Sequence, residues 1–305
     1  MPAADRAEQT VEIDGHRLKV SNLDKVLYPE TGFTKGEVID YYVRVAPAML
    51  PHIADRGLTL RRFPNGVEEQ SFFEKRCPSH RPEWVGTFDG PGDRGGSIGY
   101  CALDSVAALA WSANLAALEL HAPMARGTDI ESPTMCVFDL DPGPGAGIPE
   151  CAEVALDIRS VLERLAGLEC LAKTSGSKGL QLYVPLNTPH SHEHCSSFAL
   201  AVAQVLEKHH PDRVTSVMKK AARPGKVFID WSQNSRHKTT AAVYTLRARS
   251  RPTVSTPVTW DEIDAATSGS GLSFEAPDVL ARVGELGDLF APAIRMEQAL
   301  PEAST

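Results

Sequence analysis

The chain has 305 residues, of which 42% are hydrophobic and 23% are charged, and its net charge is −8. This composition excludes a disordered or collagen-like chain and allows one large globular domain or two moderate ones. The longest apolar run, Val106 to Trp111, is far shorter than the roughly 20 residues of a membrane-spanning helix, and no secretion signal follows Met1. We therefore expect a cytoplasmic protein with no membrane partner.

The cysteine pattern adds a prediction about redox state. Six cysteines are scattered along the chain without a Cys-x-x-Cys pair. Several lie in apolar surroundings, which is typical of reduced, packed thiols in a cytosolic protein.

The N-terminal part predicts a hairpin and a helix. Residues 11–20 alternate apolar and polar side chains about a central turn, as β-hairpins do. Thr34 and Glu37 have the spacing of a capping box, which opens an amphipathic helix. Lys25 and Lys35 flank this helix start, where unpaired backbone N–H groups would favour a phosphate. Ordinary surface charge is the alternative for both lysines.

A pair of aromatic residues follows the next predicted strand, which covers residues 58–63. Phe72 and Phe73 could stack on a base while Arg61 and Arg62 hold phosphates. Packing into the hydrophobic core explains the two phenylalanines equally well.

The region that follows predicts a loop, a helix and a strand. Residues 84–100 are rich in Gly and Asp with little periodicity, so we expect a mobile surface loop of the kind that contacts ligands. An apolar helix over residues 103–115 precedes a strand over 117–121 that ends at His121. A histidine there would suit a triphosphate contact, although most single histidines are structural.

Residues 137–142 read Val-Phe-Asp-Leu-Asp-Pro, a pattern that delivers two carboxylates to one face of a strand. Asp139 and Asp141 would repel each other unless a cation lay between them, and oxygen donors suit Mg²⁺ or Mn²⁺. A solvated strand end is the alternative. A helix over residues 149–166 is expected next.

Two strands, over residues 171–174 and 180–184, flank a short loop at residues 175–179 with the sequence Ser-Gly-Ser-Lys-Gly. Two glycines, two hydroxyls and a lysine predict a compact anion-binding nest. The loop lacks the spacing of a Walker A motif, and an ordinary hairpin tip remains the alternative.

A basic segment surrounds a third strand-borne carboxylate, Asp230, which ends a predicted strand. It is the only acid between Arg213 and Arg251, whereas Lys or Arg stands at ten positions: 213, 219, 220, 223, 226, 236, 238, 247, 249 and 251. This segment predicts a groove for a polyanion, with a solvated basic face as the alternative. Three carboxylates, a histidine and a basic groove together predict nucleotidyl transfer at two divalent cations.

Six motifs carry a family resemblance. In order they are Asp-Lys-Val-Leu-Tyr-Pro at 24–29, Phe-Pro-Asn-Gly at 63–66, Phe-Phe-Glu-Lys at 72–75, Phe-Asp-Leu-Asp-Pro at 138–142, Thr-Ser-Gly-Ser-Lys-Gly at 174–179 and Asp-Trp-Ser-Gln-Asn at 230–234. With these motifs the chain resembles the polymerase domain of bacterial ligase D, of the archaeo-eukaryotic primase superfamily, from about residue 18 to residue 290.

The resemblance implies an α+β fold with a primase-like catalytic core, in which helices flank an RRM-like antiparallel or mixed sheet. It implies one catalytic domain of two interleaved α/β lobes over residues 1–290, followed by a C-terminal tail over 291–305. It also implies a template-dependent nucleotidyltransferase that uses two Mn²⁺ or Mg²⁺ ions and prefers ribonucleotides. Such an enzyme would extend primers at gaps and broken DNA ends during DNA repair, at the bacterial nucleoid. Its partners would be gapped or 5′-phosphorylated DNA, NTP or dNTP, a separate DNA ligase and an end-binding protein.

The resemblance assigns roles to individual side chains as well. It implies metal binding by Asp139, Asp141 and Asp230; nucleotide binding by His121, Ser175, Lys178, Arg223, Gln233 and Arg247 with Phe72 and Phe73 as stacking residues; 5′-phosphate binding by Lys25 and Lys35; and template binding by Arg61 and Arg62.

No Lys-x-Asp-Gly ligase motif occurs, so we expect a stand-alone polymerase whose products another chain seals.

Two rival functions remain open. A metal-dependent glycosyltransferase would also use Asp139 and Asp141, but it would not explain the basic segment or the paired phenylalanines. A non-catalytic module that bridges DNA ends would need no catalytic carboxylate.

Overall fold

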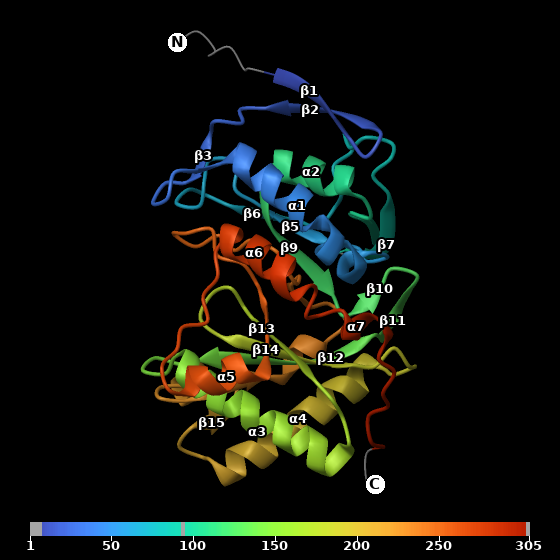
Figure 1. The fold of residues 1–305 in the computed structure, drawn as a ribbon. Coiled ribbons are helices and arrows are strands. Elements are labelled where there is room, and N and C mark those ends of the chain that lie inside the picture. The colour runs from blue at the N-terminus through green and yellow to red at the C-terminus, as the bar shows by residue number, and fades with distance from the viewer. Residues whose placement is uncertain (1–7, 93–94, 303–305) are drawn as a thin grey trace.

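Two hydrophobic cores organise the chain in this computed structural model, which describes residues 8–92 and 95–302 (Figure 1). The first core lies between two helices and a four-stranded sheet with the strand order β17-β9-β5-β6. Its main elements are α1 (Lys35–Ile53), α2 (Val106–Asn114), β5 (Thr59–Arg62), β6 (Phe72–Glu74), β9 (Ala117–Pro123) and β17 (Thr239–Ala241).

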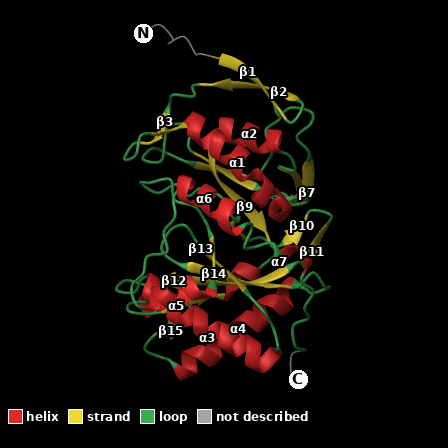
Figure 2. Ribbon diagram, in the orientation of Figure 1, coloured by secondary structure: helices red, strands yellow, loops and turns green. Residues whose placement is uncertain are grey.

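The second core lies between two helices and a six-stranded sheet with the order β15-β16-β12-β14-β13-β18. Only the pair β15 and β16 is parallel within this sheet, so the sheet is mixed. Figure 2 shows α3 and α4 beneath it. Its elements are α3 (Ile148–Ala166), α4 (His192–His209), β12 (Met135–Pro142), β13 (Leu171–Thr174), β14 (Leu180–Pro185), β15 (Val214–Thr215), β16 (Val227–Asp230) and β18 (Pro257–Val258). This arrangement confirms the predicted α+β class.

The chain crosses between the two cores more than once. After β16 it returns to the first sheet as β17, and later α6 (Ala276–Leu286) buries Val279 in the first core while α5 (Trp260–Thr267) buries Ile263 in the second. The predicted division into 1–290 and 291–305 remains a prediction, and residues 1–7 and 303–305 of these segments lie outside the described residues. Helix α7 (Pro292–Arg295) and the buried Leu300 follow within the described part.

Local sequence explains several of these elements. The predicted N-terminal hairpin is present as β1 (Glu8–Ile13) and β2 (His16–Ser21), and its two turn residues have positive φ angles of 53° and 74°, as the favoured two-residue hairpin turns require. The predicted capping box at α1 is also present. Four further strands are short: β3 (Val26–Tyr28), β4 (Phe33–Thr34), β10 (Ala125–Arg126) and β11 (Asp129–Pro133).

The loop predicted over residues 84–100 is instead an antiparallel hairpin of β7 (Thr87–Pro91) and β8 (Ser97–Cys101). Its glycines hid the alternation, because they make room for an aromatic ring. A Cβ atom at Gly90 would lie 2.9 Å from the ring of Tyr100. Residues 93–94 of the predicted loop lie outside the described residues.

The prediction of six reduced thiols was wrong for one pair. Cys77 and Cys101 form a disulfide, and the other four cysteines are free and buried. The two bonded residues are 24 positions apart, and the segment that carries Cys77 lies against β8, where the Cys77 N–H donates to the carbonyl oxygen of Gly99. Within the described residues, no helix combines the length and apolar character that a membrane crossing would need.

Candidate active site

Three carboxylates lie on one face of the six-stranded sheet. Asp139 on β12 is the register partner of Asp230 on β16, and Asp141 follows two residues later on the same strand face. The alternate residues Phe138 and Leu140 point into the second core with α3 and α4. The carboxylates therefore face the first core, on the side of the sheet opposite the covering helices.

Crowding raises the proton affinity of this group. Burial, then the charge of Asp141 and that of Asp230, raise the pKa of Asp139 to about 7, although a hydrogen bond from Gln181 opposes the shift. Burial and the charge of Asp230 also raise the pKa of Asp141. Carboxylates held this close favour either protonation or a bound cation.

Basic side chains balance part of the negative charge of the three carboxylates. Nζ of Lys238 lies 3.6 Å from Oδ2 of Asp230, and Nη1 of Arg223 lies 3.9 Å from Oδ2 of Asp141. A glycine makes the second contact possible, since a Cβ atom at Gly143 would lie 1.9 Å from the carbonyl oxygen of Arg223. The segment that carries Arg223 can thus pack directly on the turn after Asp141.

The donor set fits a hard divalent cation, although the ligands are not gathered into a closed cage. Within residues 8–92 and 95–302, no group of three or more His, Cys, Asp or Glu side chains is already arranged around one point. Oδ1 of Asp230 accepts hydrogen bonds from the backbone N–H and the hydroxyl of Ser232. The remaining oxygens are the ligand type that Mg²⁺ and Mn²⁺ prefer, and their mutual repulsion would fall if a cation bound.

A buried lysine, Lys173, lies on the same face of the sheet as the carboxylates and was missed in the sequence. Nζ of Lys173 donates to Oε1 of Gln181, to Ser255 and to the carbonyl oxygen of Ala241. Burial lowers the pKa of Lys173 to about 7. Gln181 on β14 is the register partner of both Lys173 and Asp139, so an amide and a lysine flank the central carboxylate on the side away from Asp230.

The loop at residues 175–179 differs from the predicted nest. The backbone N–H groups of Ser177 and Gly179 donate to the side chain of Ser175, and Ser175 N–H donates to the carbonyl oxygen of Gly179. These donors are therefore already used within the loop. Lys178 is exposed, and Nη1 of Arg247 donates to the carbonyl oxygen of Ser175, so positive charge near the loop comes from side chains.

A second buried carboxylate, also missed, gathers three predicted binding residues. Glu119 on β9 has a side chain that is only 2% exposed, and its oxygens lie 2.9 Å from Nε2 of His121, 3.3 Å from Nε of Arg247 and 3.4 Å from Nη1 of Arg61. Burial alone would raise the pKa of Glu119, but the hydrogen bond from His121 and the charge of Arg247 outweigh it and hold the pKa well below its usual range. The ion pair between Glu119 and Arg247 joins residues that are more than 120 positions apart in the chain.

The paired phenylalanines are on the surface, so the interpretation that they pack in the core was wrong. Phe72 is 44% exposed and Phe73 is 58% exposed on the edge strand β6. The guanidinium of Arg62 lies 5.2 Å from the centre of the Phe72 ring, and that of Arg61 lies 5.2 Å from the Phe73 ring. Exposed rings beside cations form a platform on which a nucleobase can stack.

The two N-terminal lysines lie together at the start of α1. Nζ of Lys25 donates to Asn65, and Nζ of the buried Lys35 donates to the carbonyl oxygen of Ser21. The N–H groups of residues 35–37 all have protein acceptors, so the expectation of unpaired N–H groups there was wrong. Burial, then the nearby charges of Lys25 and Arg62, lower the pKa of Lys35 to about 8.

The remaining predicted residue, Gln233, lies on the short 3₁₀ turn (Trp231–Asn234) that follows β16. It is partly exposed, three residues after the buried Asp230. The structure therefore brings the predicted metal and nucleotide residues to the region between the two cores, and it places Lys25 and Lys35 apart from them at the start of α1.

Comparison with known proteins identifies the family. Residues 34–290 match the family model described as LigD, primase-polymerase domain. The chain is 47% identical over 280 residues to the multifunctional non-homologous end joining protein LigD of Mycolicibacterium smegmatis, which covers 90% of this chain and 36% of the relative. It is 28% identical over 286 residues to the bifunctional LigD of Bacillus subtilis, covering 93% of this chain and 45% of that one.

A solved structure agrees with these sequence matches. The polymerase domain from Mycobacterium tuberculosis ligase D, in complex with DNA, superposes with a TM-score of 0.86 at 44% identity and covers 91% of this chain and 98% of that one. The fold and the site thus define a primase-polymerase of the α+β class. The chain belongs to the LigD primase-polymerase domain family. It spans about a third of the length of the mycobacterial relatives.

Replacement of Glu119 tests whether this carboxylate positions the side chains that are predicted to bind nucleotide, His121 and Arg247. We expect Glu119→Gln to weaken binding of a nucleoside triphosphate by roughly 10-fold, because Arg247 and His121 lose a charged acceptor. Isothermal titration of ATP measures the effect. Removal of a negative charge alone would tighten the binding of an anion such as ATP. A lower affinity for ATP therefore indicates that Glu119 positions its partners, whereas a higher affinity indicates only the change in net charge.

Glu262→Gln is the matched control for this experiment. Glu262 also pairs with an arginine, Arg282, but it lies on α5 away from the carboxylates. The Glu262→Gln variant should bind ATP as the wild type does. Unchanged or tighter binding by Glu119→Gln, with a normal melting curve, would show that Glu119 has no positioning role.

Proposed function

We propose that the chain is a template-dependent nucleotidyltransferase that extends primer strands at gaps and broken DNA ends in end-joining repair. The observation that carries the proposal is the shared face of Asp139, Asp141 and Asp230, where burial and then the neighbouring charges raise the pKa of Asp139. Membership of the LigD primase-polymerase domain family supports it. So does the relative from Mycobacterium tuberculosis, whose structure is a complex with DNA.

In this proposal the three carboxylates hold two Mn²⁺ or Mg²⁺ ions. When bound, such ions stabilise the charge of a transferring phosphoryl group and lower the pKa of an attacking hydroxyl. Gln181, which Lys173 holds, orients Asp139 from the neighbouring strand, and the hydroxyl of Ser232 orients Asp230. Oxygen donors supported in this way are the arrangement that metal-dependent transferases use.

The incoming nucleotide binds, in this proposal, beside the carboxylates. Its triphosphate is held by His121, Ser175, Lys178, Arg223, Gln233 and Arg247, and its base or the template base stacks on Phe72 and Phe73. The cluster around Glu119 and the contact between Arg247 and Ser175 support this placement. Arg61 and Arg62, which flank the exposed rings, contact the template. The preference for ribonucleotides rests on the family resemblance.

The downstream side of a gap binds at the start of α1. Lys25 and Lys35 would hold a 5′-phosphate, and Arg62, whose charge acts on Lys35, adds a third cation. The partners proposed with DNA are NTP or dNTP, a separate DNA ligase and an end-binding protein, and the proposed location is the cytoplasm, at the nucleoid. A glycosyltransferase would leave the exposed phenylalanines and their arginines without a role.

Primer extension tests the proposed activity directly. Asp139→Ala should lower the rate of nucleotide addition roughly 100-fold or more, because a charge that stabilises the transition state is lost, while DNA binding stays near the wild-type value. The assay uses a labelled primer on a gapped, 5′-phosphorylated template with Mn²⁺, and compares NTP with dNTP.

Asp264→Ala, an exposed aspartate on α5, is the control and should extend primers normally. Equal extension by Asp139→Ala and wild type would refute the metal site. Binding of DNA ends without extension by any form of the protein would instead favour a non-catalytic bridging module.

The pKa of Lys35 predicts a pH dependence for recognition of the 5′-phosphate. Only the protonated lysine attracts phosphate, and its pKa of about 8 means that the charge is lost as pH rises through that value. The preference for phosphorylated over unphosphorylated gapped DNA should therefore fall roughly 10-fold from pH 7 to pH 9. Fluorescence anisotropy with both DNAs measures it, and the phosphate itself keeps its charge over this range.

Lys35→Arg should remove this pH dependence, since arginine stays charged throughout. Lys25→Arg is the matched control and should retain the wild-type pH profile. A flat profile in the wild type, or an unchanged profile in Lys35→Arg, would show that Lys35 does not bind the phosphate.

A further inference from the structure

Asn234, the last residue of the Asp-Trp-Ser-Gln-Asn motif, has no role so far, and it lies where the ladder between β12 and β16 ends. That ladder covers residues 139–142 of β12, and Asp139 with Asp230 is its last pair. On the other side of β12, β14 pairs with residues 135–140. Within the part of the chain that the structure describes, the backbone of β12 before Asp139 therefore has no strand partner on the β16 side.

The side-chain amide of Asn234 takes the place of that partner. Its Oδ1 accepts from the N–H of Val137 and its Nδ2 donates to the carbonyl oxygen of Val137, both at 2.8 Å. Residues that face each other in antiparallel strands exchange the same two bonds. Nδ2 also donates to the carbonyl oxygen of Trp231 at 2.9 Å. Asn234 is fully buried, and these contacts use both N–H groups of its amide.

The turn that Asn234 closes carries groups that act on the site. The backbone N–H and the hydroxyl of Ser232 donate to Oδ1 of Asp230, and Gln233 is a predicted nucleotide-binding residue of the same turn. Val137, on the other side of the contact, lies two residues before Asp139 on β12. One side chain thus joins the strand of Asp139 to the turn that orients Asp230.

The backbone of Asn234 is held from a helix of the second core. His192 is the first residue of α4, and its ring nitrogen Nδ1 lies 2.8 Å from the carbonyl oxygen of Asn234. The other ring nitrogen, Nε2, lies 3.0 Å from the carbonyl oxygen of Ile130 on β11. Both the side chain and the backbone of Asn234 are therefore fixed by contacts with other elements.

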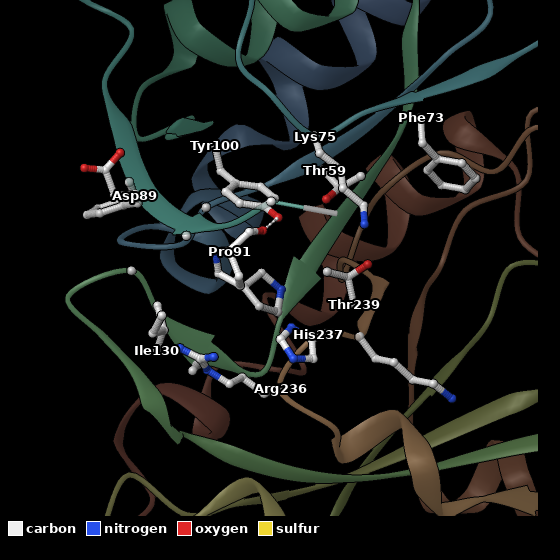
Figure 3. A pocket seen from close by; sticks show the side chains of 18 residues that line it. Thr59, Phe73, Lys75, Asp89, Pro91, Tyr100, Ile130, Arg236, His237 and Thr239 are labelled. Atoms are coloured by element: carbon white, nitrogen blue, oxygen red, sulfur yellow. Dashed lines mark hydrogen bonds between the residues drawn. The ribbon is translucent and has the colours of Figure 1, made fainter. Parts of the chain in front are cut away.

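A second contact fastens the residues after Asn234 to β11. Nη2 of Arg236 lies 2.5 Å from Oε1 of Glu131. Figure 3 shows Ile130 and Arg236 side by side on the wall of a cavity of about 600 Å³, which Lys238 and the β7–β8 hairpin also line. The segment that follows the turn is thus held in place as well.

The end of the ladder needs this support because the two carboxylates repel each other. Asp139 and Asp230 face each other in its last pair, and like charges at this distance push the strands apart. Without Asn234, the pair would be supported from one side only. Oxygen ligands that share a divalent cation must keep a fixed spacing, so the contact between Asn234 and Val137 bears on metal binding.

We propose that Asn234 is a positioning residue of the polymerase site, whose amide completes the β12–β16 ladder and so fixes the spacing of Asp139 and Asp230 for a shared cation. It acts through the backbone of Val137 and through the turn that carries Ser232. The inference rests on the proposed metal-dependent function and names a residue on which the metal affinity depends.

Asn234→Asp tests the proposal with almost no change of shape. The variant loses both N–H donors, to the carbonyl oxygens of Val137 and Trp231. We expect the affinity for Mn²⁺ alone to fall about 10-fold or more, measured by electron paramagnetic resonance of free Mn²⁺. The added negative charge by itself would raise the affinity for a cation. A fall in Mn²⁺ affinity therefore indicates lost positioning, whereas a rise indicates only the added charge.

Asn187→Asp is the matched control. Nδ2 of Asn187 also donates to two carbonyl oxygens, those of Ala293 and Met296, so the same substitution loses two donors and adds the same charge. Asn187 follows the end of β14 that pairs with Met135 rather than with Asp139. This variant should bind Mn²⁺ as the wild type does. Circular dichroism melting curves set a titration temperature at which all forms of the protein are folded.

His192→Gln tests the same support if Asn234→Asp does not fold. It leaves the amide of Asn234 in place and removes one of the two ring contacts. We expect its Mn²⁺ affinity to fall about 3-fold, and an unchanged affinity would overturn the inference.

Primer extension at two Mn²⁺ concentrations gives a second readout. Extension by Asn234→Asp should be slow at limiting Mn²⁺ and should recover at saturating Mn²⁺, which a general loss of structure would not do. No recovery, an unchanged or higher Mn²⁺ affinity in Asn234→Asp, or an equal fall in Asn187→Asp would each overturn the inference.

The titration of Mn²⁺ needs no catalysis, so the two proposals can fail separately. Wild-type Mn²⁺ affinity and normal extension in Asn234→Asp would reject the role of Asn234 and leave the polymerase function intact. Weaker Mn²⁺ binding by Asn234→Asp, in a protein that extends no primer in any form, would keep the positioning role and reject the polymerase function.

Discussion

The pairing of Asp139 with Asp230 across two antiparallel strands is the constraint on which the site depends. It places two carboxylates side by side on one face, and strand alternation adds Asp141 to that face. The opposite face of β12 is apolar and packs against α3 and α4, so a shift of register by one residue would turn the carboxylates into the core. The second core thus holds the site in register.

Charge balance then shapes the surroundings of the three carboxylates. Lys238, Arg223 and the buried Lys173 offset part of their charge. Glu119 holds Arg247 and His121 through its own buried carboxylate. Glycines at close approaches, such as Gly143 against the backbone of Arg223, let these segments come within contact of one another. The cavity beyond Lys238 extends the same basic region towards the β7–β8 hairpin.

Features with a local signal were predictable from the sequence. The alternation around Asp139, the capping box before α1 and the hairpin on either side of residues 175–179 all follow from short patterns. Features that depend on distant partners were not predictable. Glu119 meets Arg247 only through the tertiary fold, and the disulfide joins Cys77 to Cys101 where the segment after β6 lies against β8. That hairpin itself was missed because glycines replace the alternating side chains where Tyr100 packs.

Direct titration of Mn²⁺ tests the central claim most closely, namely that the paired carboxylates form a divalent cation site. Electron paramagnetic resonance can count free Mn²⁺ while the protein is added in the presence of a nucleoside triphosphate. The account predicts about two ions per chain for the wild type and a loss of at least one, or a fall in affinity of roughly 10-fold or more, for Asp139→Asn. Identical stoichiometry and affinity in the two proteins would contradict it.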